Sequence, residues 1–238
     1  MTKVLIINGS PKATKSNTAF LLTPFTEGMM KAGASVEIIY PSKLKIRPCI
    51  GCFKCWYETI GECFIQDDMQ ELYQKLKSSD ILVLATPVHS SIPGDMQNFL
   101  NRMVPLIEPI LEFRDGRTRA QCHEDVKISK ILAAVVSGWW EIENTDSAIG
   151  VIEELSKNYS IEFAGAIRRP HCYPLQDETE KSKAILKRLE EVGFKFIKEG
   201  KIAKSDLDFI SQPLAEKDEY TNWKTSLYLK AKGEKPSI

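Results

Sequence analysis

Four cysteines lie close together in the first third of the chain. Cys49, Cys52 and Cys55 follow one another at intervals of three residues, and seven residues separate Cys55 from Cys63. Thiolates at this spacing in an irregular loop can surround one face of an iron–sulfur cluster, and a fourth thiolate nearby completes the coordination. The spacing therefore predicts metal chemistry, with all four cysteines as ligands.

Three interpretations of this cysteine loop are open. A 4Fe-4S cluster needs four thiolates, and Gly51 permits close approach of the backbone. Zinc accepts the same four ligands, although structural zinc sites more often use two separated CxxC pairs. The thiols could also be unligated, with Trp56 and Tyr57 filling the place of a cluster. We favour the cluster, then bare thiols, then zinc, and we predict no role for the isolated Cys122 and Cys172.

The composition bounds the class of protein. The 238 residues suit one sizeable domain with a tail. Lys and Arg number 32, as do Asp and Glu, so the charge balance predicts no nucleic-acid or membrane partner. The apolar run before Asn8 is too short for a signal peptide or a membrane span. We therefore expect a cytoplasmic, reducing environment, where clustered cysteines bind metals or do redox work more often than they pair.

Five apolar runs rich in Val and Ile punctuate the chain and indicate buried strands. They cover residues 4–7, 36–40, 81–85, 131–136 and 161–167. Between them, apolar residues recur at helical spacing, as in Met96, Phe99, Leu100, Met103 and Val104, and again in Ile185, Leu189, Val192 and Phe196. This alternation predicts an α/β fold with a doubly wound, five-stranded parallel sheet and helices on both faces.

Two segments do not fit the alternation. Residues 113–127 are polar and contain Asp115-Gly116, which predicts a long surface loop. The end of the chain from about Lys204 is too aromatic for a solvated tail and is expected to dock on the body or on a neighbouring subunit. Its aromatic and apolar side chains are Tyr220, Trp223, Leu227 and Tyr228.

The first predicted strand leads into a loop rich in hydroxyl groups. Gly9-Ser10-Pro11-Lys12 follows the strand, and Ser16-Asn17-Thr18 opens a helix. Backbone N–H groups, hydroxyls and a helix N-terminus together suit a phosphate, although Ser16 or Asn17 could merely cap the helix. The loop lacks GKS, GKT and GxGxxG, which disfavours ATP and the usual dinucleotide grip. Ligands bind beyond the carboxyl ends of parallel strands, which favours a binding site here.

Three segments resemble the FMN-contacting loops of flavodoxin-like NAD(P)H-dependent FMN reductases: GSPKATKSNT, TPVHSSIPGDMQNFLNR and SGWW. The resemblance covers roughly residues 2–196 in order and spacing. PCIGCFKC, together with Cys63 and the following DDM, resembles the iron–sulfur flavoprotein branch. The resemblance implies a flavodoxin-like FMN-binding domain over 1–203, with the cysteine loop at 48–66 and a C-terminal extension at 204–238.

The resemblance also implies roles for individual residues, and no catalytic side chain, because the flavin carries the reaction. The FMN phosphate would be held by Ser10, Lys12, Ser16, Asn17 and Thr18. The isoalloxazine edge and ribityl chain would lie along Thr86, Pro87, Val88, His89, Ser90, Ser91 and Ile92. The ring would be approached from the fourth strand by Ser137, Gly138 and Trp139.

The implied function is that of an FMN-dependent oxidoreductase. Electrons would pass between NAD(P)H or ferredoxin and a small-molecule acceptor such as a quinone, through FMN and the cysteine-bound cluster. Alternatives are a cluster-free NAD(P)H-dependent FMN or quinone reductase, and a flavodoxin-like electron carrier. The balanced charge disfavours the carrier, because flavodoxins are usually acidic. Relatives bind FMN near a subunit interface, so we expect a homodimer or homotetramer.

Overall fold

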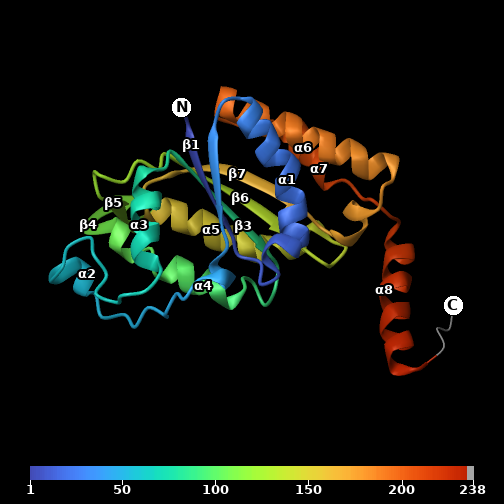
Figure 1. Cartoon of the computed structure of the whole chain (residues 1–238), viewed down its shortest axis with the longest axis horizontal. Coiled ribbons are helices and arrows are strands. Elements are labelled where there is room, and N and C mark those ends of the chain that lie inside the picture. The colour runs from blue at the N-terminus through green and yellow to red at the C-terminus, as the bar shows by residue number, and fades with distance from the viewer. Residues whose placement is uncertain (235–238) are drawn as a thin grey trace.

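The computed structural model describes residues 1–234 and contains a five-stranded sheet in the order β2–β1–β3–β6–β7 (Figure 1). All neighbouring strands are parallel. The strands are β1 (Lys3–Asn8), β2 (Ser35–Ile39), β3 (Ile81–Pro87), β6 (Lys130–Val136) and β7 (Glu162–Arg169). The predicted doubly wound parallel sheet is confirmed, and β1, β3 and β6 are almost continuously buried, as expected of central strands covered on both faces.

Two layers of helices cover the sheet. One layer consists of α1 (Asn17–Lys31), α6 (Glu180–Glu199) and α7 (Lys204–Ser211), and the other of α3 (Met69–Ser78), α4 (Gly94–Asn101) and α5 (Asp146–Asn158). Successive side chains of a strand point to opposite faces. Accordingly, Val4 and Ile6 pack in the core beneath α1 and α6, whereas Leu5 and Ile7 pack in the core beneath α3 and α4.

A close contact between α1 and α6 depends on two glycines. A Cβ atom on Gly28 would lie 1.9 Å from the carbonyl oxygen of Glu190, and one on Gly193 would lie 2.0 Å from that of Phe25. Only glycine allows the two backbones to approach this closely. The approach brings Phe25 and Phe196 together, with ring centroids 6.4 Å apart, in a fully buried contact.

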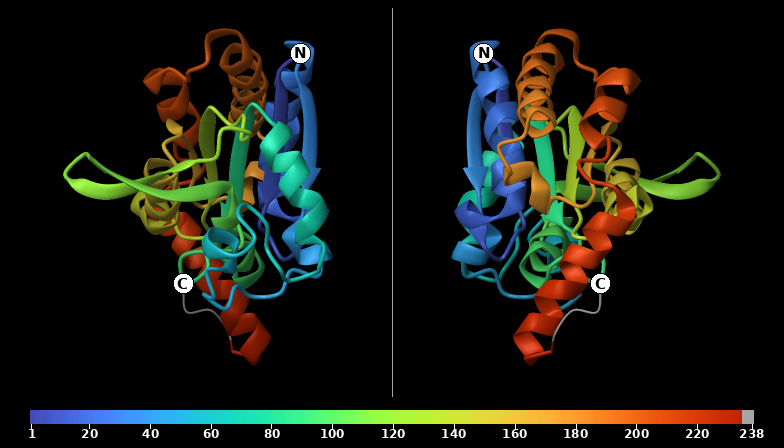
Figure 2. Two further views of the ribbon diagram at one scale, coloured as in Figure 1. Left: turned by 90° about the vertical axis from the view of Figure 1, so that its left-hand side faces the viewer. Right: turned by 90° about the vertical axis from the view of Figure 1, so that its right-hand side faces the viewer.

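A β-hairpin projects from the body between α4 and β6 (Figure 2). It consists of β4 (Ile107–Arg114) and β5 (Arg117–Cys122), which pair antiparallel. Asp115 and Gly116 have φ angles of 52° and 75°, as in the type I′ turn that closes two-residue hairpins. The predicted loop over 113–127 is therefore wrong for residues 113–122. Most of the hairpin's side chains are not buried, so its strands lack the apolar alternation by which strands are predicted.

The C-terminal extension forms two helices. α7 packs on β7 and α6 with Ile210 buried, whereas α8 (Lys217–Lys232) diverges from the body (Figure 1). Residues 235–238 of the predicted extension lie outside the described residues. Within residues 1–234, none of the helices is both long and apolar enough to cross a membrane.

The remaining short elements are α2 (Lys54–Tyr57) in the cysteine loop and five 3-10 turns. These turns are η1 (Ala13–Lys15), η2 (Pro41–Lys43), η3 (Val104–Leu106), η4 (Ile142–Thr145) and η5 (Tyr173–Gln176).

Candidate functional site

The three loops predicted to contact FMN follow β1, β3 and β6, which are neighbours in the sheet. Because the strands are parallel, their carboxyl ends meet at one edge, where open α/β sheets bind ligands. Backbone hydrogen bonds connect neighbouring loops: Gly9 donates to Ala85 O at 2.8 Å, and Val88 donates to Val136 O at 2.8 Å. The fold thus brings all three predicted segments to the same edge.

In the first loop, Ser16 caps α1. Its hydroxyl accepts from Ala19 N at 3.0 Å and donates to Ala13 O at 2.7 Å. The capping alternative is therefore correct for Ser16. Asn17 begins the helix, and its side-chain oxygen accepts a hydrogen bond from Gln176. Lys12 is exposed, so its charge is available to a ligand at this edge.

Several polar groups of this first loop remain unused by the protein. The N–H groups of Asn17 and Thr18 lie in the first turn of α1, where no intrahelical acceptor exists. Within residues 1–234 the fully buried hydroxyl of Thr18 and the side-chain nitrogen of Asn8 have no hydrogen-bond partner. Ser10 is also buried. Unpaired donors at a helix N-terminus fit a bound anion, so the loop has the chemistry that an FMN phosphate requires.

The second loop is a tight turn held at both sides. Ser91 has a φ angle of 84°, and its N–H donates to His89 O. Positive φ at a non-glycine residue is strained and persists only where the surroundings enforce it. Val88 and Ile92 pack against the core on the two sides of the turn, while His89 and Ser90 are exposed. The turn of the predicted stretch therefore points outward. Thr86, near the end of β3, is buried, and its hydroxyl donates to the carbonyl oxygen of Pro87, the last residue of β3.

The third loop combines a buried hydroxyl, a glycine and an exposed indole. Ser137 is buried, and its hydroxyl accepts from Trp139 N at 3.1 Å. A Cβ atom on Gly138 would lie 3.1 Å from the ring of Tyr173, so a larger residue would crowd that ring. Trp139 is 67% exposed and offers an aromatic face at the edge of the sheet.

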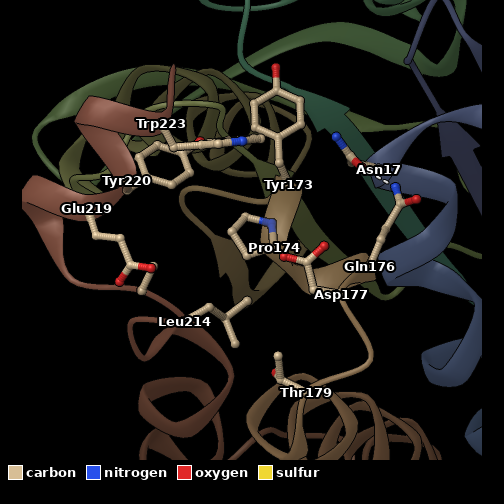
Figure 3. Close-up of a pocket in the computed structure, with 11 residues that line it drawn as sticks. Asn17, Tyr173, Pro174, Gln176, Asp177, Thr179, Leu214, Glu219, Tyr220 and Trp223 are labelled. Carbon is tan, nitrogen blue, oxygen red and sulfur yellow. Dashed lines mark hydrogen bonds between the residues drawn. The ribbon is translucent and has the colours of Figure 1, made fainter. Parts of the chain in front are cut away.

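A cavity of about 570 Å³ lies beside these loops rather than between them (Figure 3). It is lined by residues of η5 and α8, including Tyr173, Tyr220 and Trp223, and it meets the predicted FMN loops through Asn17. The sequence pattern predicts no role for Tyr173, and for Tyr220 it predicts only docking on the body or on a neighbouring subunit. Their proximity to Gly138 depends on packing between segments that are far apart in the chain.

The four cysteines line one cavity of about 80 Å³. Cys49 and Cys52 are exposed, and Cys55 and Cys63 are half-buried. Within residues 1–234, no three Cys, His, Asp or Glu side chains stand close enough to hold a single ion. Four thiols around a shared cavity, with no nitrogen or oxygen ligand, fit the donor set of an iron–sulfur cluster, whose iron atoms separate the thiolates.

The electrostatics of this cavity combine thiols with a buried cation. Burial raises the pKa of Cys55 to about 11, and the neighbouring thiolates, Cys63 first, add to the effect. Arg102 also lines the cavity and pairs with Asp67 at 2.7 and 3.1 Å. Burial opposes ionisation of Asp67, but hydrogen bonds from Arg102 and from the backbone of Arg47 outweigh it and keep the pKa below its usual value. The pair therefore stays charged beside the thiols.

Arg102 lies beside the cysteines, although the sequence pattern predicts no role for it. Its guanidinium also donates to Arg47 O at 2.8 Å, and Tyr73 donates to its carbonyl oxygen at 2.8 Å. Asp67 belongs to the DDM segment after Cys63, and Asp68 accepts from Lys45 N at 2.7 Å. These contacts fix both ends of the cysteine loop. The combination of DDM with an Arg at the end of the α4 segment is the signal that could have revealed the pair.

Comparison with known proteins decides the family. The family profile described as NADPH-dependent FMN reductase matches residues 2–138. The chain belongs to this family. The segment matched by the FMN reductase profile contains the first two predicted FMN loops and the cysteine loop, and it ends at Gly138 of the third loop.

Curated relatives of this FMN reductase family member are iron–sulfur flavoproteins. One from Archaeoglobus fulgidus is 36% identical over 101 residues, covering 42% of this chain and 48% of that protein. One from Methanocaldococcus jannaschii is 32% identical over 105 residues, covering 44% of this chain and 53% of that protein. The match spans about half the length of these curated relatives. The predicted resemblance to FMN reductases is confirmed, and the names of these relatives agree with the predicted branch.

Solved structures similar to this family member share its fold. An NAD(P)H:quinone oxidoreductase from Methanothermobacter marburgensis superposes with a TM-score of 0.55 at 17% identity, covering 82% of this chain and 96% of that chain. An FMN-dependent NADH-azoreductase from Bacillus anthracis, solved in complex with FMN, has a TM-score of 0.56 at 18% identity, covering 83% and 100%. These likenesses support the flavodoxin-like architecture.

Proposed function

We propose that this chain is an FMN-dependent oxidoreductase whose flavin binds at the carboxyl edge of β1, β3 and β6. The observation that carries the proposal is the unpaired polar groups at the N-terminus of α1, in a chain that matches the FMN reductase family over residues 2–138. Bound FMN supplies two-electron and one-electron transfer, which no side chain of this edge provides.

The first loop would hold the phosphate. The N–H groups of Asn17 and Thr18 and the Thr18 hydroxyl are donors without a partner among residues 1–234, and they lie at the positive end of α1. Lys12 would add a positive charge from the exposed side of the loop. Ser10 and Ser16 would contribute by fixing the loop, since the Ser16 hydroxyl is engaged in the helix cap.

The other two loops would position the ring. The turn at His89, Ser90 and Ser91, exposed at its first two residues, would offer backbone groups to the polar edge of a flavin, and its anchors Val88 and Ile92 keep it in place. Ser137 and Gly138 would line the flavin ring on the side of β6. Trp139 would cover one face of that ring and exclude water from it. No side chain is required as a general base, because the flavin carries the chemistry.

We further propose that Cys49, Cys52, Cys55 and Cys63 bind a 4Fe-4S cluster. Support comes from the shared cavity, from the all-thiol donor set and from the names of the curated relatives. Arg102 would offset part of the negative charge of the thiolates, because its paired guanidinium lines the same cavity. The alternative is a cluster-free reductase with bare thiols.

Electron donor and acceptor follow from the chemistry of the cofactors. The proposed donors are NAD(P)H, which the family name favours, or a ferredoxin that would deliver single electrons to the cluster. The proposed acceptor is a small molecule such as a quinone.

We also propose a homodimer or homotetramer. Its support is the exposure of large apolar side chains on the two segments that project from the body (Figure 2), Phe113 on the hairpin and Leu227 and Tyr228 on α8.

Protein purified without oxygen tests these proposals. FMN bands in the visible spectrum are expected, with iron and sulfide near four per chain, and little zinc. Absence of flavin would overturn the oxidoreductase proposal, and flavin without iron would leave the cluster-free reductase. Turnover with NADH or NADPH and a quinone, compared with reduced ferredoxin, identifies the donor. Sedimentation as a monomer would contradict the oligomer.

The ligand set is tested by Cys63→Ser. Most of the iron should be lost, because one of four thiolates is removed, while FMN content stays unchanged. Cys122→Ser is the matched control, since Cys122 stands apart from the cysteine cavity and should leave the iron content as it is. Equal iron in both variants would contradict the assignment of Cys63.

A further inference from the structure

The third loop, which we call the SGWW loop (residues 137–140), is held by a helix from the far end of the chain. Tyr220 of α8 donates its hydroxyl to Gly138 O at 2.7 Å, across 82 residues of sequence. Tyr220 is 3% exposed and is the buried residue of α8. This one side chain therefore connects the diverging helix to the peptide that the proposed flavin site contains.

Further contacts from the C-terminal extension reach the same loop. The indole of Trp140 donates to Ala215 O at 3.4 Å, and Lys217 pairs with Glu141 at 2.7 Å. The extension thus contacts positions 138, 140 and 141 in succession.

Two buried side chains after β7 anchor the extension to the body. Arg169 is fully buried and donates to Ile210 O at 2.7 Å and to Gln212 O at 2.9 Å. His171 accepts from Leu214 N at 3.0 Å through Nε2, so its Nδ1 carries the proton that faces Trp140 O at 3.1 Å. One imidazole therefore bridges the extension and the SGWW loop.

A second tyrosine close to Gly138 also contacts this helix. The Tyr173 ring, which would lie 3.1 Å from a Cβ atom on Gly138, packs on Trp223 with centroids 6.1 Å apart. Lys224 lies over the Tyr173 ring at 4.1 Å. Figure 3 shows Tyr173, Tyr220 and Trp223 converging at one end of the large cavity. Gly138 therefore lies close to two tyrosines, Tyr220 of α8 and Tyr173, which packs on α8.

We propose that α8 completes the flavin site and that Tyr220 is its positioning residue. By holding the Gly138 carbonyl, Tyr220 keeps the SGWW loop in the conformation that receives the flavin. Loops at strand ends are otherwise mobile, and binding to a preformed loop costs less conformational entropy than binding to a mobile one. The inference rests on the proposed FMN site, because Tyr220 acts through Gly138 and not on the flavin itself.

Tyr220→Phe tests the proposal in the full-length protein after removal of FMN. The Kd for added FMN, measured by quenching of flavin fluorescence, should rise about fivefold to tenfold, the effect of one lost hydrogen bond. Thr221→Val is the matched control, because Thr221 lies on the same helix, is exposed and donates its hydroxyl to Lys217 O and Asp218 O of that helix. Its Kd should equal that of the wild type. Trp223→Ala, which leaves the Tyr220 hydroxyl intact, should give a smaller rise.

A second measurement separates positioning from general stability. In Tyr220→Phe without FMN, hydrogen exchange should be faster than in the wild type at the amides of Trp139 and His171, which form hydrogen bonds within and beside the SGWW loop. The thermal midpoint of unfolding should stay close to that of the wild type. Unchanged exchange together with an unchanged Kd in Tyr220→Phe would overturn the inference. If the wild type binds no FMN, the proposed function fails, and the exchange comparison still decides whether Tyr220 holds the loop.

Discussion

The edge of the sheet and the cysteine loop are two sites built in opposite ways. The edge consists of short loops whose anchors are strand ends and core side chains, such as Val88 and Ile92. The cysteine loop has little regular structure apart from α2, and it exposes Ile50, Tyr57 and Ile60. Its attachment includes the buried ion pair between Arg102 and Asp67 and a few hydrogen bonds, such as that from the Trp56 indole to Val104 O. A site on strand ends is formed before its cofactor arrives, whereas an irregular loop gains order from a few contacts with the body and from its ligand.

The largest expected effect comes from breaking that ion pair. Asp67→Ala leaves the Arg102 guanidinium, which is 1% exposed, without its carboxylate, and it should lower the free energy of unfolding by about 3–5 kcal/mol. Iron should be lost at the same time. Urea unfolding and iron analysis measure both.

Asp125→Ala is the control for that change, because Asp125 pairs with Lys77 on the surface at 2.8 Å. Exposed pairs contribute about 0–1 kcal/mol, so stability and iron should stay close to those of the wild type. Equal effects of the two substitutions would show that the buried pair does not anchor the cysteine loop.

The two regions should lose stability at different pH values. Burial and the neighbouring Arg169 lower the pKa of His171 to about 4, while the unfolded chain has its ordinary value near 6.5. The folded state therefore keeps His171 neutral where the unfolded state is protonated, so stability falls as the pH drops from about 6.5 to about 4. Between pH 7 and pH 5 the loss should be about 2 kcal/mol. Besides Arg169, the phenol of Tyr220 faces the ring.

The cysteine loop should respond at lower pH. The pKa of Asp67 is held below its ordinary value, so its contribution is complete above about pH 4 and is lost as the pH falls through the lowered value. As the pH is lowered from 7 to 4, the protection factors for hydrogen exchange, which correct for the pH dependence of intrinsic exchange, should therefore fall first in the SGWW loop. In His171→Gln the dependence of stability on pH between 7 and 5 should flatten; an unaltered slope would contradict the assignment to His171.

The smallest effect concerns the phosphate loop. Thr18→Val removes a buried hydroxyl that has no partner within residues 1–234, so the apoprotein should be unchanged or more stable by up to about 1 kcal/mol. The Kd for FMN should nevertheless rise about tenfold, since a donor to a charged phosphate is lost. Thr14→Val, at an exposed position of the same loop, is the control. A Kd unaffected by Thr18→Val would remove Thr18 from the proposed site.

Much of the fold could be predicted because buried strands and amphipathic helices leave periodic patterns. The five apolar runs became the five parallel strands, and Ile185, Leu189 and Phe196 form the buried face of α6. The hairpin at 107–122 could not be predicted in this way. Its stability comes from backbone pairing and a type I′ turn, and its largely exposed strands carry no apolar alternation.

In the candidate site, too, local features could be predicted and contacts between distant segments could not. Ser16-Asn17-Thr18 was recognisable from the sequence because a helix N-terminus after a strand is a local feature. Whether Ser16 capped the helix or stayed free was a matter of side-chain geometry, and the structure resolves it as a cap. The partners of Tyr220 and Arg102 could not be predicted locally, since Gly138 and Asp67 lie 82 and 35 residues away.

The sequence by itself determined the strands, the order of the three loops and the set of four clustered thiols, because each depends on residue type at short spacing. Only the tertiary structure decided which buried groups remain without partners, how a cation comes to lie beside the thiols, and which helix supports the SGWW loop. These are properties of packing between distant segments. A hydrogen bond or an ion pair exists only once the chain has brought both groups together and removed the water that would otherwise satisfy them.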